Sequence, residues 1–235
     1  MTDLAGREEV EILADKDPGV GLPGRVYLPG YSRTMGPQSH LFAERERLQS
    51  LTWEYFDVKQ LSPTIGAELV GLDLSQELTD EVVSEIQQAL WDYKVIFFRN
   101  QEITSEQQIR FAQRFGELEI HPFLPPNTET PELVRFEKNA NAAGYENQWH
   151  HDVTWRETPS QGAILRAIEI PPIGGDTLFV DANAAYEGLT QERKDEIDSL
   201  NAVHDFLRAF GRQVPKEKLA EMREMYPLVK HPVVI

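Results

Sequence analysis

Residues 148–155 read QWHHDVTW and place two adjacent histidines beside a carboxylate. If this stretch is extended, successive side chains point to opposite faces, so His150 and Asp152 point the same way and His151 points away. An imidazole and a carboxylate at this spacing can bind one metal ion, as two of the three ligands of the 2-His-1-carboxylate triad of non-haem Fe(II). His151 is then a packing or supporting residue. An isolated pair of this kind is also typical of an exposed histidine and aspartate that bind nothing.

The composition excludes several classes of protein. The chain has 235 residues, 40% of them hydrophobic and 26% charged, which is ordinary for a globular domain. Its net charge of −16 opposes binding to nucleic acid or to anionic membranes. There is no cysteine, no apolar secretory signal, and no apolar run near the roughly 20 residues that span a bilayer. We therefore expect a cytoplasmic protein without a membrane or nucleic-acid partner.

The chain is expected to divide into an N-terminal extension over residues 1–51 and one domain over residues 52–235. Residues 15–37 carry four prolines and five glycines, so neither a helical nor a strand period persists there. Helices are predicted over 79–94, 104–116, 190–200 and 215–225, and the second opens with a capping box from Thr104 to Gln107. Strands are predicted within 56–74, broken at Pro63 and Gly66, and over 95–99, 132–138, 162–170 and 176–180. This order favours an α+β, mainly β fold: a double-stranded β-helix, or jelly roll, with flanking helices.

Four short motifs follow one another in a recognisable order. They are FGELEIHPF (115–123), WHHDVTW (149–155), GGDTLF (174–179) and AVHDF (202–206). In order and spacing they resemble the taurine dioxygenase family of Fe(II)- and 2-oxoglutarate-dependent oxygenases, from about Phe56 to Ile235. Several motifs in register over such a length are far more specific than the histidine–aspartate pair alone.

The resemblance implies a role for each matching residue. His150 and Asp152 match the first two iron ligands. Thr177, 27 residues after His150, matches the threonine whose hydroxyl binds a carboxylate of 2-oxoglutarate, and the turn at Gly174–Gly175 presents it. His121 matches a substrate-binding histidine, although a buried structural histidine before a proline would look the same. The implied partners are O₂ and a small-molecule substrate, and we expect a homo-oligomer.

Two departures from the family pattern bear on the substrate. Leu124 stands where the taurine enzyme has a tyrosine, and Glu146 stands where an amide contact is expected. Because a carboxylate is a poor partner for a sulfonate, these residues favour an alkyl sulfate ester or another, more apolar acid over taurine. The presence of Asp152 argues against a halogenase, which needs that position vacant for a halide.

The family's third iron ligand, a histidine, and its 2-oxoglutarate-binding arginine are expected downstream of the segment KHPVVI (230–235). His204 and His231 match positions that do not bind the metal. We therefore expect a domain without its C-terminal strands and a poor catalyst as it stands. The predicted function is a dioxygenase that hydroxylates a small organic acid, sulfonate or alkyl sulfate ester and releases succinate and CO₂. A non-catalytic metal- or small-acid-binding remnant of the fold is the alternative, and a cupin-like isomerase is weaker because it leaves Thr177 unexplained.

Overall fold

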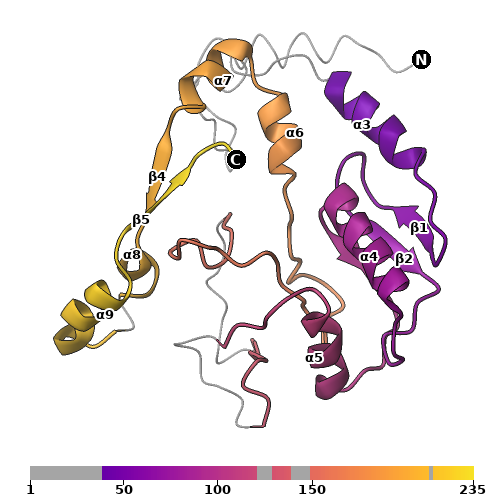
Figure 1. Cartoon of the computed structure of the whole chain (residues 1–235), viewed down its shortest axis with the longest axis horizontal. Helices are drawn as coiled ribbons and strands as arrows, with labels where there is room; N and C mark the ends of the chain where they lie inside the picture. Colours follow the sequence, from indigo (N-terminus) through magenta and orange to yellow (C-terminus); the bar gives the residue numbers. More distant parts are fainter. Residues whose placement is uncertain (1–38, 121–128, 139–148, 212–213) are drawn as a thin grey trace.

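The computed structural model describes residues 39–120, 129–138, 149–211 and 214–235. The predictions for His121, Leu124 and Glu146 therefore lie outside the described residues, as does most of the predicted N-terminal extension. Figure 1 shows a helix-and-sheet unit formed by the first third of the described chain, and a hairpin with short helices formed by the last part. Between the two, the described residues 114–120, 129–138 and 149–181 form no helix or strand.

The first unit is a small sheet covered by helices. Its elements are α3 (Ser39–Gln49), β1 (Asp57–Gln60), β2 (Ala67–Val70), α4 (Asp80–Tyr93), β3 (Ile96–Phe97) and α5 (Ser105–Gln113). Strand β2 is central, antiparallel to β1 and parallel to β3. The two breaks predicted at Pro63 and Gly66 lie between β1 and β2, and Gly66 has a φ of 88°, which favours glycine.

Local signals in the sequence account for α4 and α5. The hydroxyl of Thr79 accepts a hydrogen bond from the first turn of α4, and Lys94 ends the helix at a φ of 66°. The predicted capping box is present on α5, where Thr104 and Gln107 satisfy each other's backbone N–H groups. The apolar stripe of α4 contributes Ile86 and two other buried side chains, Ala89 and Tyr93, to a core that also contains Leu48 of α3. Residues 39–49 therefore pack on the domain.

The second unit carries a two-stranded antiparallel sheet and a small apolar cluster. Its elements are α6 (Ala182–Glu187), α7 (Gln191–Ile197), β4 (Asn201–His204), α8 (Phe206–Phe210), the 3₁₀ helix η1 (Lys216–Lys218), α9 (Leu219–Met225) and β5 (Val229–Pro232). The cluster is formed by Val153, Trp155, Phe206 and Met222, and the ring of Phe206 is fully buried. It thus joins α8 and α9 to the segment that follows His150 and Asp152.

Three predicted strands are not found. Residues 132–138, 162–170 and 176–180 have no regular strand, and no described strand pairs with them. Several of their apolar side chains are exposed, among them Leu165, Ile168 and Leu178 at 71–77%. A strand needs hydrogen bonds from a neighbour, so an apolar alternating pattern does not form one by itself. The described chain is thus of mixed helix and sheet, and within it the jelly roll stays a prediction.

Side chains nevertheless hold the irregular segments on the first unit. Arg166 donates to the carbonyl oxygen of Ile103 at 2.6 Å, and Gln108 of α5 donates to that of Ile164 at 3.3 Å. The ring of Phe179 contacts that of Phe97 in β3 edge to face, with the ring centres 6.2 Å apart. None of the described helices is long and apolar enough to span a membrane.

Candidate active site

His150 and Asp152 lie together, as the sequence predicts. Nε2 of His150 is 3.4 Å from Oδ1 of Asp152, and both side chains are 63% exposed. The neighbouring His151 uses its ring differently, because its Nδ1 lies 2.9 Å from the carbonyl oxygen of Asp152. A carbonyl oxygen only accepts hydrogen bonds, so Nδ1 of His151 carries the hydrogen. The structure thus separates the two histidines: one faces the carboxylate and the other contacts the backbone.

The backbone around this pair differs from the extended strand that we predicted. Residues 152–155 form a turn, and Val153 has a φ of 60°, which is rare for a β-branched residue. Val153 and Trp155 are both buried, and the ring of Trp155 contacts those of Phe206 and Phe210 with centres 5.6 and 5.2 Å apart. Burial of these two side chains offsets the cost of the unusual backbone conformation.

Two histidines from the β4–β5 hairpin contact the same turn. Nδ1 of His204 is 2.9 Å from the hydroxyl oxygen of Thr154. Nε2 of His231 is 2.9 Å from the carbonyl oxygen of Thr154 and 3.0 Å from that of Arg156. The sequence analysis predicts that neither histidine binds the metal, but it does not predict these contacts. No pattern near QWHHDVTW indicates residues 50–77 positions away.

On its other side the turn is tied to the segment that precedes His121. Arg156 forms an ion pair with Glu119 at 2.9 Å, and the hydroxyl of Ser160 donates to the other oxygen of Glu119 at 3.2 Å. Glu119 is two residues before the predicted substrate-binding histidine. The ion pair therefore connects the segments that carry the predicted metal ligands and the predicted substrate contact.

Thr177 is exposed and follows a turn with the expected geometry. Gly174 and Gly175 have φ angles of 78° and 74°, a region that glycine occupies without steric cost. In the described part of the chain no hydrogen bond joins Thr177 to His150 or Asp152. Its predicted role toward 2-oxoglutarate therefore stays a prediction.

The described residues do not complete a three-ligand metal site. Among them, no group of three histidine, aspartate or glutamate side chains is close enough to hold a metal ion. His204 and His231 direct a ring nitrogen at the turn backbone or the Thr154 hydroxyl, and neither joins His150 and Asp152. The described donors thus amount to one imidazole and one carboxylate.

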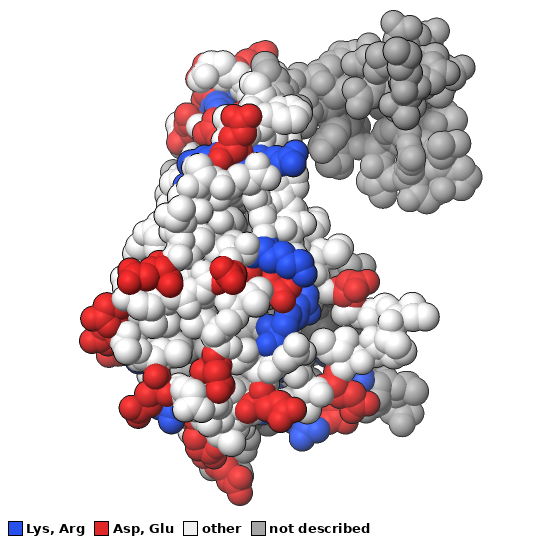
Figure 2. Space-filling model, turned by 90° about the vertical axis from the view of Figure 1, so that its right-hand side faces the viewer, with Lys and Arg blue, Asp and Glu red and all other residues white. Residues whose placement is uncertain are grey.

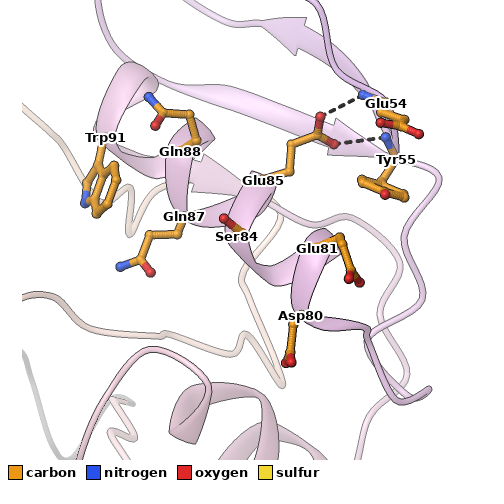
Figure 3. Close-up of a pocket in the computed structure, with 9 residues that line it drawn as sticks. All are labelled: Glu54, Tyr55, Asp80, Glu81, Ser84, Glu85, Gln87, Gln88 and Trp91. Carbon is orange, nitrogen blue, oxygen red and sulfur yellow. Dashed lines mark hydrogen bonds between the residues drawn. The ribbon is translucent and has the colours of Figure 1, made fainter.

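A surface hollow lies elsewhere in the described part of the chain, on the outer face of α4. It measures about 690 Å³ and is lined from Glu54 to Trp91, with no residue of the 149–181 segment. Figure 3 shows that the carboxylate of Glu85 is directed at the backbone, where it accepts hydrogen bonds from the N–H groups of Glu54 and Tyr55 at 2.7 and 2.9 Å. Acidic side chains are spread over the face seen in Figure 2, as expected from the net charge. The residues that line this hollow do not form a pair of candidate metal ligands like His150 and Asp152.

Comparison with known proteins identifies the family. The model of the family described as "Taurine catabolism dioxygenase TauD, TfdA family" matches residues 57–235. The chain belongs to this family of dioxygenases. This finding confirms the resemblance that the four motifs carry.

Two relatives have names that refer to alkyl sulfates or sulfate esters. The chain is 34% identical over 190 residues to an alkylsulfatase of Acinetobacter baylyi, covering 77% of this chain and 59% of the relative. It is 35% identical over 187 residues to an alpha-ketoglutarate-dependent sulfate ester dioxygenase of Pseudomonas putida, covering 76% and 61%. The chain thus spans about three fifths of the length of these curated relatives.

Solved structures support the same fold. A taurine dioxygenase from Burkholderia xenovorans matches with a TM-score of 0.62 and 34% identity, covering 77% of this chain and 58% of that one. The structure of AAD-2 in complex with Mn(II) and N-oxalylglycine matches with a TM-score of 0.55 and 30% identity, covering 76% and 66%. The described architecture is therefore that of a dioxygenase of this family, of mixed helix and sheet.

Proposed function

We propose that this chain is part of an Fe(II)- and 2-oxoglutarate-dependent dioxygenase that hydroxylates a small organic acid, sulfonate or alkyl sulfate ester. The observation that carries the proposal is the 3.4 Å approach of His150 Nε2 and Asp152 Oδ1, two exposed side chains. It occurs in a member of a dioxygenase family whose sulfate ester and sulfonate members are named as dependent on alpha-ketoglutarate. We also propose that residues 52–235 form the jelly-roll domain of this enzyme.

The two donors suit a metal of this type. Bonds from first-row metals to imidazole nitrogen and carboxylate oxygen measure about 2.0–2.2 Å, so two donors at a right angle on one ion lie about 3 Å apart. The 3.4 Å separation needs only a small adjustment to reach this distance. Imidazole and carboxylate are also the ligand types of the non-haem Fe(II) triad. The third donor would come from outside the described residues.

When bound, the metal supplies the oxidative decarboxylation of 2-oxoglutarate with O₂ and the hydroxylation of the substrate. The chain's own residues bind and orient the reactants. Thr177 would donate its hydroxyl hydrogen to a carboxylate of 2-oxoglutarate, and His121 would contact the anionic group of the substrate. N-oxalylglycine, an analogue of 2-oxoglutarate, occupies the related AAD-2 structure together with Mn(II), which supports this choice of cofactors.

An alkyl sulfate ester is the substrate class that the residues favour. The two relatives described above are an alkylsulfatase and a sulfate ester dioxygenase. Leu124 and Glu146 replace the tyrosine and the amide expected for taurine, and a leucine suits an alkyl chain. We further propose a cytoplasmic homo-oligomer whose partners are the small-molecule substrate and O₂.

The experiment is an assay of substrate-dependent succinate formation over a panel of sulfonates, sulfate esters and carboxylic acids. The full-length protein that contains this chain is compared with its Asp152→Ala variant. We expect succinate to form fastest with an alkyl sulfate ester and to fall to background in the variant. Metal binding without succinate formation on any substrate would favour the alternative, a non-catalytic metal- or small-acid-binding remnant.

A further inference from the structure

We propose that His204 and His231 are positioning residues. They fix the turn that begins at Asp152, so that the side chains of His150 and Asp152, the two predicted metal ligands, stay on the same side of the backbone. The inference rests on the proposed function, since it assigns these residues to the same site. His204 and His231 are not among the predicted metal ligands. Their contacts are to Thr154 and Arg156, two and four residues after Asp152.

The hairpin geometry directs both rings toward the turn. In the β4–β5 pairing His231 lies opposite Ala202, and His204 lies opposite Val229. The four residues therefore share one face of the two-stranded sheet, and all four are buried or half-buried while the alternate residues are exposed. The rings of the two histidines contact each other edge to face, with centres 5.0 Å apart. They form a unit that reaches the turn at three atoms.

The hydrogen-bond chemistry of His231 is unambiguous. Its Nε2 faces two carbonyl oxygens, of Thr154 and Arg156, and a carbonyl oxygen cannot donate. Nε2 must therefore carry the hydrogen and donate to both, so it is not available to a metal. These bonds join the two ends of the peptide segment that contains buried Trp155. They hold the turn in which Val153 takes its φ of 60°.

Without these hydrogen bonds, the apolar side chains of the turn would still be buried, but its backbone would no longer be held in one conformation. Trp155 and Val153 would still favour burial, yet an unusual φ persists only where the surroundings determine it. A change of a few tens of degrees at Val153 would redirect Asp152 relative to His150. Residues that orient metal ligands typically change metal affinity about 10–100-fold when they are replaced.

The test uses the same full-length protein as the succinate assay, with Co(II) alone as the probe, because the visible absorption of Co(II) reports binding without turnover. His231→Gln keeps an N–H donor near the position of Nε2, and His231→Leu removes it. His204→Asn and His204→Leu form the matching pair for Nδ1. Val203→Ala is the control for the hairpin, since Val203 lies on β4 but on the opposite, exposed face. Hydrogen–deuterium exchange over residues 152–156, measured without metal, reports the turn itself.

We expect both leucine variants to bind Co(II) about tenfold or more weakly and to exchange faster over residues 152–156. The glutamine and asparagine variants and Val203→Ala should keep a Co(II) affinity within about threefold of that of the wild type.

Equal behaviour of the leucine and amide variants would overturn the inference, as would losses in Val203→Ala that match those of the leucine variants. If exchange responds as expected but Asp152→Ala binds Co(II) like the wild type, the positioning of the turn stands and the proposed metal site fails. If Co(II) binding needs Asp152 but the histidine variants change neither measurement, the proposed function stands and the inference fails.

Discussion

Nε2 of His150 lies 3.4 Å from Oδ1 of Asp152 even though the chain leaves the extended conformation at Asp152. In an extended strand, the alternation of side chains would place His150 and Asp152 on the same side. Here the turn that begins at Asp152 places them so. The next residue, Val153, is buried in the cluster around Phe206 and so faces away from the exposed pair. The pair thus owes its arrangement to contacts with α8 and with the β4–β5 hairpin.

The first prediction concerns metal binding. His150→Ala and Asp152→Ala should each weaken Fe(II) binding by the full-length protein by more than about 100-fold, since loss of a residue that merely orients a ligand already costs about 10–100-fold. His151→Ala should leave the affinity largely intact, because the His151 ring contacts only the carbonyl oxygen of Asp152 among the contacts described above. Anaerobic competition with a coloured chelator measures the three affinities. Equal losses in all three variants would contradict the assignment.

The second prediction concerns 2-oxoglutarate. Thr177→Ala should weaken 2-oxoglutarate binding roughly ten- to hundred-fold, because one charge-assisted hydrogen bond contributes about 1.5–3 kcal/mol. Thr177→Ser keeps the hydroxyl and is the matched control. Titration calorimetry of the metal-loaded protein measures both, and Fe(II) affinity should hardly change. An unchanged affinity for 2-oxoglutarate in the alanine variant would show that another group binds its carboxylate.

The third prediction separates substrate binding from cofactor binding. His121→Ala should raise the KM for the substrate by about tenfold or more, as expected for a lost hydrogen bond to a charged group, and leave the KM for 2-oxoglutarate unchanged. His121→Gln retains an N–H donor and should recover part of the loss. Steady-state succinate formation gives both constants. If decarboxylation without substrate falls as strongly as coupled turnover, His121 has a structural role instead.

The helices could be predicted because their signals are local. Thr79 and Thr104 accept hydrogen bonds from the turns that they precede, and Lys94 ends its helix within the same segment. The strands over 162–170 and 176–180 could not be predicted reliably from apolar alternation, because a strand exists only where a neighbour pairs with it. In the described chain the exposed side chains of Leu165 and Leu178 mark segments without such a neighbour.

The candidate site likewise has one part that could be predicted from the sequence and one part that could not. The spacing of His150 and Asp152 indicated the pair, and the structure brings the two side chains together. The turn itself was not predictable, because it depends on His231, which is 77 residues from Thr154, and on His204, which is 50 residues away. Alternation along QWHHDVTW carries no information about such distant contacts.

The last prediction tests the pH dependence of the unit that supports the turn. Asp205 begins α8 and accepts hydrogen bonds from Arg223 of α9 at 2.8 and 3.0 Å and from the N–H of Leu207 at 2.8 Å. The hydrogen bonds from Arg223 are the main cause that lowers the pKa of the Asp205 carboxyl below its ordinary value. A carboxylate with a lowered pKa stabilises the fold above its unfolded-state pKa of about 3.9, and this contribution is lost as the pH falls through the folded-state pKa.

Asp205→Asn retains an oxygen that can cap α8 but removes the charge. We expect this variant to melt about 1–4 °C below the wild type near pH 7, a small effect because the ion pair is partly exposed. The difference should shrink as the pH falls from the unfolded-state pKa of about 3.9 through the lower folded-state pKa, because the wild-type carboxyl takes up its proton on unfolding and then in the folded state over this interval. Glu221→Gln, an exposed change on α9, is the control for net charge. Melting curves followed by circular dichroism from pH 3 to pH 8 measure the effect. A constant difference across this range would show that the loss of the ion pair is not its cause.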